Sequence, residues 1–345
     1  MPDLDPDATI NTRRPAGHRE VDVSAPVQKT SAINLVILLS GLTGLALVGG
    51  AAYVLFGPAS VAPEATRQPP AITAGVAQPP SPRMILPHRT EAEILAQQAL
   101  VPIPVWFAAN PRIMVLDFPD LLSQGMAFNR IAAFLEKAGL PRDRVLNDQE
   151  LAAAIKAENA TPETYYYGHD YRLADVVRFF AMADLQKFRL SAEEEALRAI
   201  LVGSGMLTAK ADGAVISIPR EGSDPFVDAS GRMSLLRHEL SHGEFFTSPD
   251  YADFTRRFWA VDMNESDRAG FRGFLTRQGY DPKDEDLLIN EMQAHLMHTT
   301  DIRYFNARDC GLPLARVNAL RAMFAAKMPA GWLQDVARKA VASLP

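Results

Sequence analysis

The chain has 345 residues and a formal net charge of −6, and its hydrophobic fraction of 48% is that of an ordinary globular protein. This length allows one large domain or two ordinary ones with a sizeable core. An acidic chain offers no electrostatic basis for binding nucleic acid, so we expect no nucleic-acid partner. The single cysteine, Cys310, excludes an internal disulfide and a zinc site built on cysteines.

The first 90 residues predict three segments that precede any folded domain. Residues 1–30 are polar and rich in Asp, Pro and Arg, which is typical of a disordered tail. Residues 31–57 carry no charge, and their apolar core from Leu35 to Phe56 is long enough to cross a lipid bilayer as one helix. Residues 58–90 hold eight prolines, which favours an extended, semi-rigid linker.

Basic residues predict how this transmembrane anchor is oriented. Arg13, Arg14, Arg19 and Lys29 precede the apolar run, whereas only Arg67 follows it closely. Because basic flanks stay in the cytoplasm, we expect a single-pass inner membrane protein with a cytoplasmic N-terminus and a periplasmic C-terminal domain. The alternative is a cleaved signal peptide, which the length of the apolar run disfavours.

The region 91–230 predicts an N-terminal lobe of helices and short strands. The expected helices are Glu91–Leu100, Leu121–Lys137, Asn147–Ala157 and Ser191–Val202, the last two opened by capping residues. Strand-like runs are Val105–Phe107 and Ile113–Phe118, and Met206–Lys210 with Ala214–Pro219 indicates a β-hairpin. Pro219 confines its strand to a sheet edge or ends it. An edge strand there would suit peptide binding, and the alternative is a hairpin that only covers the core.

An aromatic segment, Tyr165–Tyr171, contains one histidine. We interpret it as half-buried packing with polar tips, and a cleft wall is the functional alternative.

The stretch Leu235–Phe246 contains His238-Glu239-Leu240-Ser241-His242, the pattern H-E-x-x-H. Residues four apart share one face of a helix, so both imidazoles can bind a single ion. Glu239 is then placed to act as the general base on a water that this ion activates. Leu236 and Leu240 supply a second, apolar face that can hold the helix against a core. We therefore predict a catalytic Zn²⁺ site.

A catalytic zinc usually has three protein ligands and one open position. The continuation H-E-x-x-H-x-x-G-x-x-H is absent, because Phe245 stands at the glycine position. The best third ligand is Glu291, which shares a face of the expected helix Asp284–His298 with His295 and His298. Glu244 is a weaker candidate, since two residues after His242 it points away from the ligand face.

The role of the two downstream histidines is open at this stage. His295 could replace Glu291 as a ligand, and the more favoured prediction is that it supports the site or steadies the transition state. Candidates for stabilising the oxyanion are His295, His298, Tyr280 and Tyr304.

These residues resemble the zinc metallopeptidases called gluzincins, in which H-E-x-x-H on one helix is followed by N-E-x-x-A on a later helix. The resemblance implies that His238, His242 and Glu291 hold zinc, that Glu239 is the general base, and that the substrate is a peptide or protein. It covers only these two short stretches. It departs at His295, where related proteins often place an aspartate that orients the first histidine.

The expected fold is α+β and mainly helical: a zincin-like domain over 91–345 with a small antiparallel sheet over the zinc helix. Its second lobe, 231–345, holds the zinc site, and the further helices expected there are Asn264–Gly279, Leu314–Met328 and Trp332–Ser343. The alternative function is a membrane-tethered binding or assembly factor with a structural zinc, closed by four ligands if both Glu291 and His295 coordinate. A third possibility is an enzyme kept latent by its own tail.

Overall fold

The computed structural model describes residues 83–208 and 210–342. The predicted tail, the transmembrane anchor and most of the proline-rich linker lie outside these residues. Within the described part of the chain, no helix is long and apolar enough to span a bilayer. The sequence places the start of the globular part near Glu91. Regular structure begins three residues earlier, with a short strand at His88–Arg89.

A five-stranded sheet forms the centre of the fold, in the order β1-β2-β3-β5-β4. Its strands are β1 His88–Arg89, β2 Ile103–Phe107, β3 Ile113–Phe118, β4 His169–Arg172 and β5 Ala214–Pro219. β2 pairs with β3 and β4 with β5 in antiparallel fashion, whereas β1 with β2 and β3 with β5 are parallel. The sheet is therefore mixed, and the purely antiparallel sheet expected from the sequence is wrong. The long helical connection between β3 and β5 lets β5 return parallel to β3.

The predicted hairpin is only half present. Ala214–Pro219 forms β5, but Met206–Thr208 and Lys210 form no strand. β5 lies inside the sheet between β3 and β4, and Pro219 is its last residue, opposite Phe118. Proline thus ends this strand without placing it at an edge. The edge strand on this side of the sheet is β4, which comes from the aromatic segment and was not predicted as a strand.

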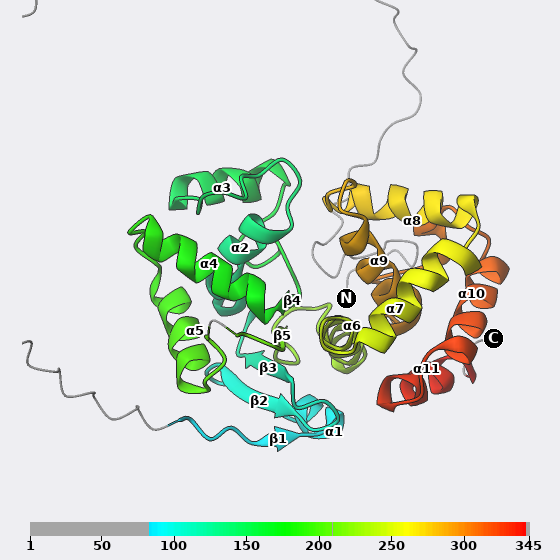
Figure 1. The fold of residues 1–345 in the computed structure, drawn as a ribbon, viewed down its shortest axis with the longest axis horizontal. Coiled ribbons are helices and arrows are strands. Elements are labelled where there is room, and N and C mark those ends of the chain that lie inside the picture. The colour runs from blue at the N-terminus through cyan, green and yellow to red at the C-terminus, as the bar shows by residue number, and fades with distance from the viewer. Residues whose placement is uncertain (1–82, 209, 343–345) are drawn as a thin grey trace, which may run out of the picture. The chain divides into compact units, whose positions relative to one another are not determined.

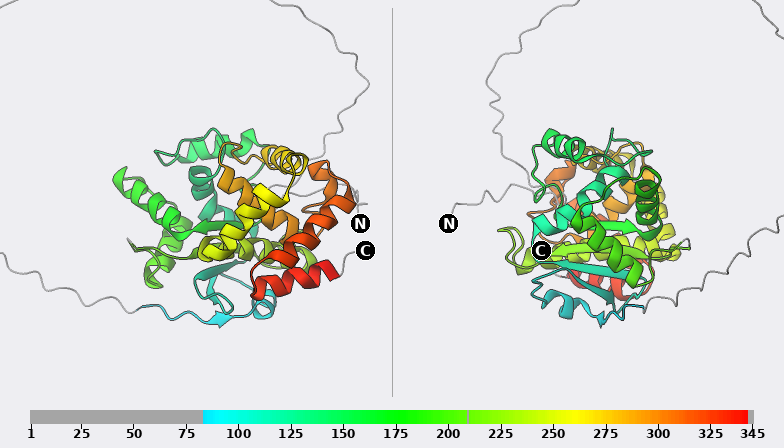
Figure 2. Two further views of the ribbon diagram at one scale, coloured as in Figure 1. Left: turned by 45° about the vertical axis from the view of Figure 1, so that its right-hand side comes forward. Right: turned by 90° about the vertical axis from the view of Figure 1, so that its left-hand side faces the viewer.

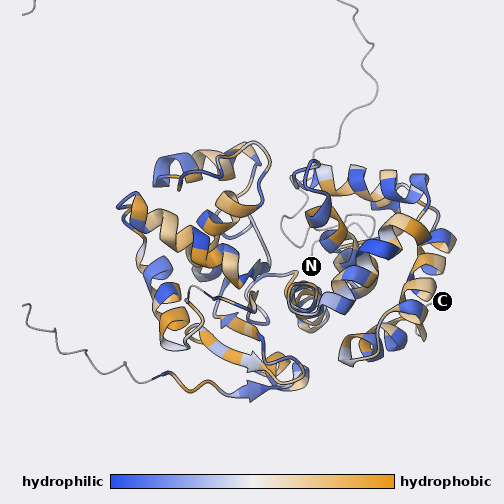
Figure 3. Ribbon diagram, viewed as in Figure 1, coloured by the Kyte–Doolittle hydropathy of each residue, from blue (hydrophilic) through white to orange (hydrophobic). Residues whose placement is uncertain are grey.

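Alternation along the central strands divides the core between the two faces of the sheet. Successive side chains of a strand point to opposite faces. Val115 and Ile216 pack with Leu236 and Leu240 of α6 (Ala229–Thr247), which covers one face. On the opposite face, Met114, Leu116 and Val215 pack with Phe128 and Ile131 of α2 (Leu121–Leu135). In Figure 3 the central strands β2 and β3 are largely apolar, and the helices around the sheet carry both apolar and polar residues.

The remaining helices of the N-terminal half are α1 Glu91–Leu95, α3 Asp148–Ala157, α4 Leu173–Leu185 and α5 Ala192–Gly203. The predicted starts of α3 and α5 are confirmed, since Asn147 with Glu150 and Ser191 with Glu194 form capping boxes. α1 ends earlier than expected, because the chain must extend before Pro102 to enter β2. α4 was not predicted.

Helices alone form the C-terminal half, which packs around a second core that includes Phe258, Phe274, Leu288 and Phe324. They are α7 Pro249–Arg257, α8 Glu265–Arg277, α9 Glu285–Gln293, α10 Leu314–Lys327 and α11 Trp332–Ala342, with π-helical turns η1 Phe258–Asp262 and η2 Ala294–His298 and a 3₁₀ turn η3 Ala307–Cys310. The predicted helices 264–279, 314–328 and 332–343 are confirmed with small shifts at their ends.

Helix α6 lies between the sheet and these C-terminal helices (Figure 1). The turned views again show α7 to α11, in yellow to red, as one group beside the green helices of the N-terminal half (Figure 2). α6 contacts the sheet through β5, β4 and β3, and it contacts α7, α9 and η2 on its other side. This central position buries both faces of the helix that carries the H-E-x-x-H motif.

Candidate metal centre

Helix α6 begins at an aspartate cap, where the side chain of Asp228 accepts a hydrogen bond from the backbone N–H of Gly231. Its apolar face, with Leu236 and Leu240, lies on the sheet, as predicted. His238 and His242 lie on the side that meets η2 and α9, and each is at most 1% exposed. Buried imidazoles need polar partners, and these partners define the site.

The proton on His238 can be assigned from its neighbour. The Nδ1 atom lies 2.8 Å from the hydroxyl oxygen of Thr299. That hydroxyl donates its own hydrogen to the backbone carbonyl of Ala294 at 3.0 Å, so it can only accept from the imidazole. His238 therefore carries its proton on Nδ1 and presents a lone pair on Nε2. This is the arrangement of a metal-ligating histidine held by a second group.

His242 has a corresponding partner in Asp170, whose Oδ2 lies 3.6 Å from Nδ1. A carboxylate beside Nδ1 favours the tautomer that is protonated there, which leaves the Nε2 lone pair directed at the centre. Asp170 comes from β4, where it pairs with Ile216 and therefore faces α6. His169 and Tyr171 flank it and face Phe128 on the other side of the sheet.

The Nε2 atoms of His238 and His242 lie 3.0 Å apart. Two imidazole lone pairs at this separation repel each other unless a proton or a metal ion lies between them. Ligands about 2.1 Å from a tetrahedral zinc are themselves roughly 3.4 Å apart. The spacing of the two nitrogens is therefore close to the spacing that one metal ion requires.

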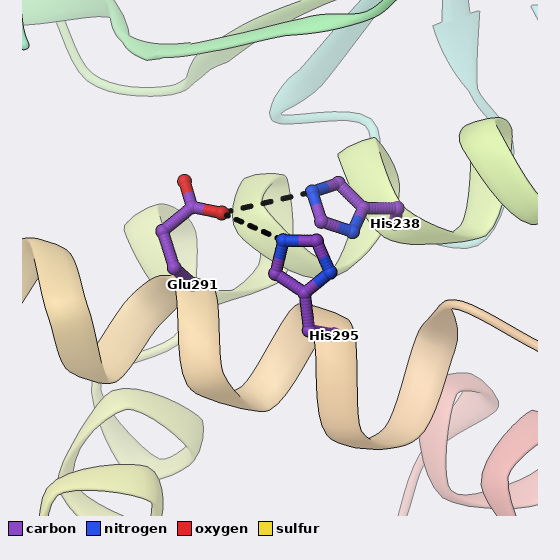
Figure 4. Close-up of side chains that lie close together, drawn as sticks. All are labelled: His238, Glu291 and His295. Carbon is purple, nitrogen blue, oxygen red and sulfur yellow. Dashed lines mark ion pairs between the residues drawn. The ribbon is translucent and has the colours of Figure 1, made fainter. Parts of the chain in front are cut away.

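Glu291 of α9 completes this side of the centre. Its Oε2 lies 3.8 Å from His238 Nε2, and its Oε1 lies 3.9 Å from His242 Nε2. His295, one turn later, places its Nε2 3.7 Å from the same Oε2. Figure 4 shows the imidazoles of His238 and His295 directed toward the Glu291 carboxylate from two different helices. All of these side chains are buried.

The described residues contain two groups whose possible ligand atoms all lie within 4.8 Å of one another. One is His238 with Glu291 and His295, and the other is Asp170 with Glu239 and His242. Such buried groups could hold a metal ion. The sequence anticipated five of these six residues. Asp170 was missed, although it lies inside the aromatic segment that the sequence singled out. Only the pairing of β4 with β5 turns it toward α6.

The carboxylate of Glu239 packs against Gly168, the residue before β4. A Cβ atom at position 168 would lie only 2.0 Å from Glu239 Oε1, so the close approach requires glycine. Glu239 is 2% exposed and is grouped with His242 and Asp170. The structure therefore places the carboxylate of Glu239 beside His242 and Asp170 and packs it against Gly168.

His298 does not join either group. Its Nε2 lies 3.3 Å from the hydroxyl of Tyr251, which itself donates to Gln293. Burial is the main cause that lowers the pKa of His298 to about 3, with smaller contributions from the neighbouring His242 and Arg237, so His298 is neutral. An α-helix would put His298 on one face with Glu291 and His295, but the chain forms the π-turn η2 over this stretch. Its i→i+5 bonds widen the turn, so each residue advances less around the axis.

The His298 contact is one end of a buried polar chain. Gln293 donates through Nε2 to the hydroxyl of Ser241, and that hydroxyl donates to the backbone carbonyl of His238. These hydrogen bonds hold α9 against α6, the helix that carries the motif. Ser241, the uncharged residue inside the motif, is thus used for positioning.

The other predicted candidates lie elsewhere. Tyr304 donates its hydroxyl to the carbonyl of Phe226 at 2.6 Å, and Tyr280 forms a backbone bridge with Lys137. Glu244 points away from the centre, as expected, and accepts hydrogen bonds from Asn110 and Trp332. Cys310 is a buried free thiol in the second core.

A cavity of about 310 Å³ lies beside the centre. Its walls include the successive β4 residues Asp170, Tyr171 and Arg172 and the α9 residues Leu287 and Asn290. Because Asp170 also contacts His242, the cavity and the centre share a residue. Asn290 immediately precedes Glu291, so a second wall of the cavity adjoins the centre.

No protein-family model matches the chain, and neither a curated protein nor a solved structure matches it. The resemblance to gluzincins therefore depends on the motif residues alone.

Proposed function

We propose that this chain is a zinc-dependent metallopeptidase, anchored in the inner membrane by residues 31–57 with its folded domain in the periplasm. One observation carries the proposal. The Nε2 atoms of His238 and His242 meet at 3.0 Å, with Nδ1 of each beside an oxygen of Thr299 or Asp170. This arrangement favours a bound cation at the H-E-x-x-H motif.

The donor set favours zinc. Two neutral imidazoles and one carboxylate are the ligands of a known class of catalytic zinc sites, and His238, His242 and Glu291 supply them. A Zn²⁺ bound there would act as a Lewis acid and make water acidic enough to attack near neutral pH. Glu239 takes the proton from the attacking water and delivers it to the departing amine. Gly168 keeps the carboxylate in place for both transfers.

The neighbouring edge strand supports a peptide substrate. β4 lies at an edge of the sheet, and edge strands are where extended peptides add to a sheet. The 310 Å³ cavity lies along Asp170, Tyr171 and Arg172 of this strand, where a substrate side chain can enter. A peptide bound there would place a carbonyl close to Glu239 and the two histidines.

A structural metal site is the second candidate, and one observation favours it. His295 Nε2 lies 3.7 Å from Glu291 Oε2, as close to that oxygen as His238 Nε2. If His295 also coordinates, four protein ligands close the site, and the chain is better described as a membrane-tethered binding or assembly factor.

The decisive test uses the full chain in detergent, with Glu239→Gln and His242→Ala variants. We expect about one zinc per chain in the wild type and in Glu239→Gln, and little in His242→Ala. Casein and a mixture of fluorogenic peptides should be cleaved by the wild type only, with a loss of roughly 100-fold or more in Glu239→Gln. Full activity of Glu239→Gln would disprove the mechanism.

The number of ligands separates the two candidates. In the open site, Glu291→Ala loses zinc whereas His295→Ala keeps it, and X-ray absorption reports three protein ligands. Loss of zinc in both variants, four protein ligands and no cleavage of either substrate would support the structural role instead.

A further inference from the structure

A second cavity, of about 330 Å³, lies on the far side of η2 from the sheet. It is lined by the end of η2, the segment 299–307, α10 and α11. The two helices α10 and α11 lie side by side in Figure 1. This volume is within the range of small-molecule sites. Thr299, whose hydroxyl contacts His238, lies between the cavity and the metal centre, and none of the six residues in the two ligand groups lines the cavity.

Among the described residues that line the cavity, Arg321 of α10 is the only charged one. Its Nε donates to the carbonyl of Leu296 at 2.8 Å, and its guanidinium lies 5.9 Å from the ring of Phe305. Among the described residues, no carboxylate forms an ion pair with it. Burial lowers the pKa of Arg321, so bringing an anion to this guanidinium would stabilise its charge. The remaining N–H groups of the fork suit a carboxylate.

Asn318 lies one turn before Arg321 on the same face of α10 and lines the same cavity. Its Oδ1 is buried, and no described residue donates a hydrogen bond to it. A buried acceptor without a hydrogen-bond donor is unfavourable, so a ligand N–H that reaches it would be stabilised there. The cavity therefore presents a cation for a carboxylate and, next to it, an acceptor for an N–H group.

The rest of the wall is largely apolar and includes Met297, Ile302, Phe305, Leu314 and Val341. Side chains of this kind would accommodate an aliphatic or aromatic group.

We propose that this cavity binds an apolar α-amino acid group, either a free amino acid or the C-terminal residue of a peptide. Arg321 binds the carboxylate, Asn318 accepts from the neighbouring N–H, and the apolar wall holds the side chain. Both sources present the same three features in the same order. The inference is independent of the proposed peptidase activity, because it needs no metal ion and no cleavage.

Calorimetric titration of the full chain with L-leucine, N-acetyl-L-leucine, 4-methylpentanoate and L-leucinamide tests the site. We expect L-leucine or its N-acetyl form to bind, and the tighter of the two identifies the free amino acid or the peptide terminus as the ligand. Leucinamide, which lacks the carboxylate, should bind at least tenfold more weakly, as should 4-methylpentanoate, which lacks the N–H donor.

Variants assign the two recognition groups. Arg321→Gln should weaken binding of the preferred ligand roughly tenfold to hundredfold, and the matched control Arg338→Gln, an exposed arginine of α11, should leave it unchanged. Asn318→Leu should remove the discrimination between the preferred ligand and 4-methylpentanoate. His242→Ala, which disables the metal centre, should still bind the ligand.

Three results would overturn the proposal. The first is that neither L-leucine nor N-acetyl-L-leucine binds at millimolar concentration. The second is that leucinamide binds the wild type as tightly as leucine does, a comparison that needs no variant to fold. The third is binding lost in His242→Ala but kept in Arg321→Gln, which would place the ligand at the metal centre.

Discussion

At the scale of single residues, the centre is organised by side chains that contact the histidines. Thr299 fixes the proton of His238, Asp170 faces Nδ1 of His242, and Gly168 leaves room for Glu239. Such outer contacts orient metal ligands and are as specific as the ligands themselves. The absence of a side chain at position 168 is therefore as necessary as the presence of the carboxylate.

Gly168→Ala tests this directly. A Cβ there would overlap Glu239 Oε1 at 2.0 Å, and the end of the glutamate can move more easily than the backbone. We expect the variant to fold and to keep its zinc, but to lose about 100-fold in peptide hydrolysis because the general base is displaced. Activity is measured with fluorogenic peptides beside the zinc content.

The matched control is Gly331→Ala, where a Cβ meets no atom within 4 Å. It should match the wild type in both measurements. Wild-type activity in Gly168→Ala would show that the position of Glu239 is unimportant.

At the scale of elements, a buried arginine joins α6 to the sheet. Arg232 and Asp117 are both 0% exposed, and two nitrogens of the guanidinium contact the two carboxylate oxygens at 3.1 and 2.9 Å. Arg232 also donates to the carbonyls of Pro219 and Ile94. One side chain thus holds α6 to β3, β5 and α1. Burial raises the pKa of Asp117 although Arg232 opposes this.

Arg232→Met leaves Asp117 as an uncompensated buried charge. We expect the free energy of unfolding at pH 7 to fall by about 3–5 kcal/mol. Because the pKa of Asp117 is raised in the folded state, that state binds its proton more readily than the unfolded chain does. Losing Arg232 removes the group that lowers this pKa, so the carboxyl of the variant is protonated at higher pH than that of the wild type, and the difference in stability should shrink as the pH falls.

Urea denaturation at several pH values measures both effects. Arg144→Met, which removes an exposed ion pair with Glu150, serves as the control and should change little. Equal loss from both substitutions would contradict the role given to Arg232.

At the scale of the whole molecule, the candidate centre connects the two halves of the fold. Its residues come from β4 in the N-terminal half, from α6 in the middle, and from α9 and η2 in the C-terminal half. A metal ion bound only by the folded protein stabilises it by mass action, by about 4 kcal/mol at a thousand times its Kd.

Removing the metal should therefore loosen the whole fold. We expect EDTA to lower the Tm of the zinc-loaded chain by roughly 10 °C, and added zinc to restore it. His242→Ala should have a low Tm that EDTA does not change. Scanning calorimetry with and without EDTA makes the measurement, and equal Tm values for the wild type in both conditions would argue against a metal ion that links the halves.

Several features of the fold follow from local sequence patterns and agree with the structure. Capping pairs such as Ser191 with Glu194 start helices where the sequence predicts them, and the motif helix buries Leu236 and Leu240 as its spacing requires. The helix with Glu291 was predicted to run from about Asp284 to His298, and the chain is helical over nearly this whole range. Its last turn, 294–298, is a π-turn, and no residue in that stretch indicated this.

The sequence alone was enough to predict the candidate ligands and the candidate general base. H-E-x-x-H and the later Glu and His each lie within one or two turns of a single helix, so their local spacing identifies them. Tertiary structure alone decided how that chemistry is arranged. It placed β5 inside the sheet, made the aromatic segment an edge strand, and brought Asp170 and Thr299 to the two histidines. Helix phase depends on neighbours four residues away, whereas the pairing of β3 with β5 and the contact of His238 with Thr299 join residues far apart in the sequence, which no local pattern records.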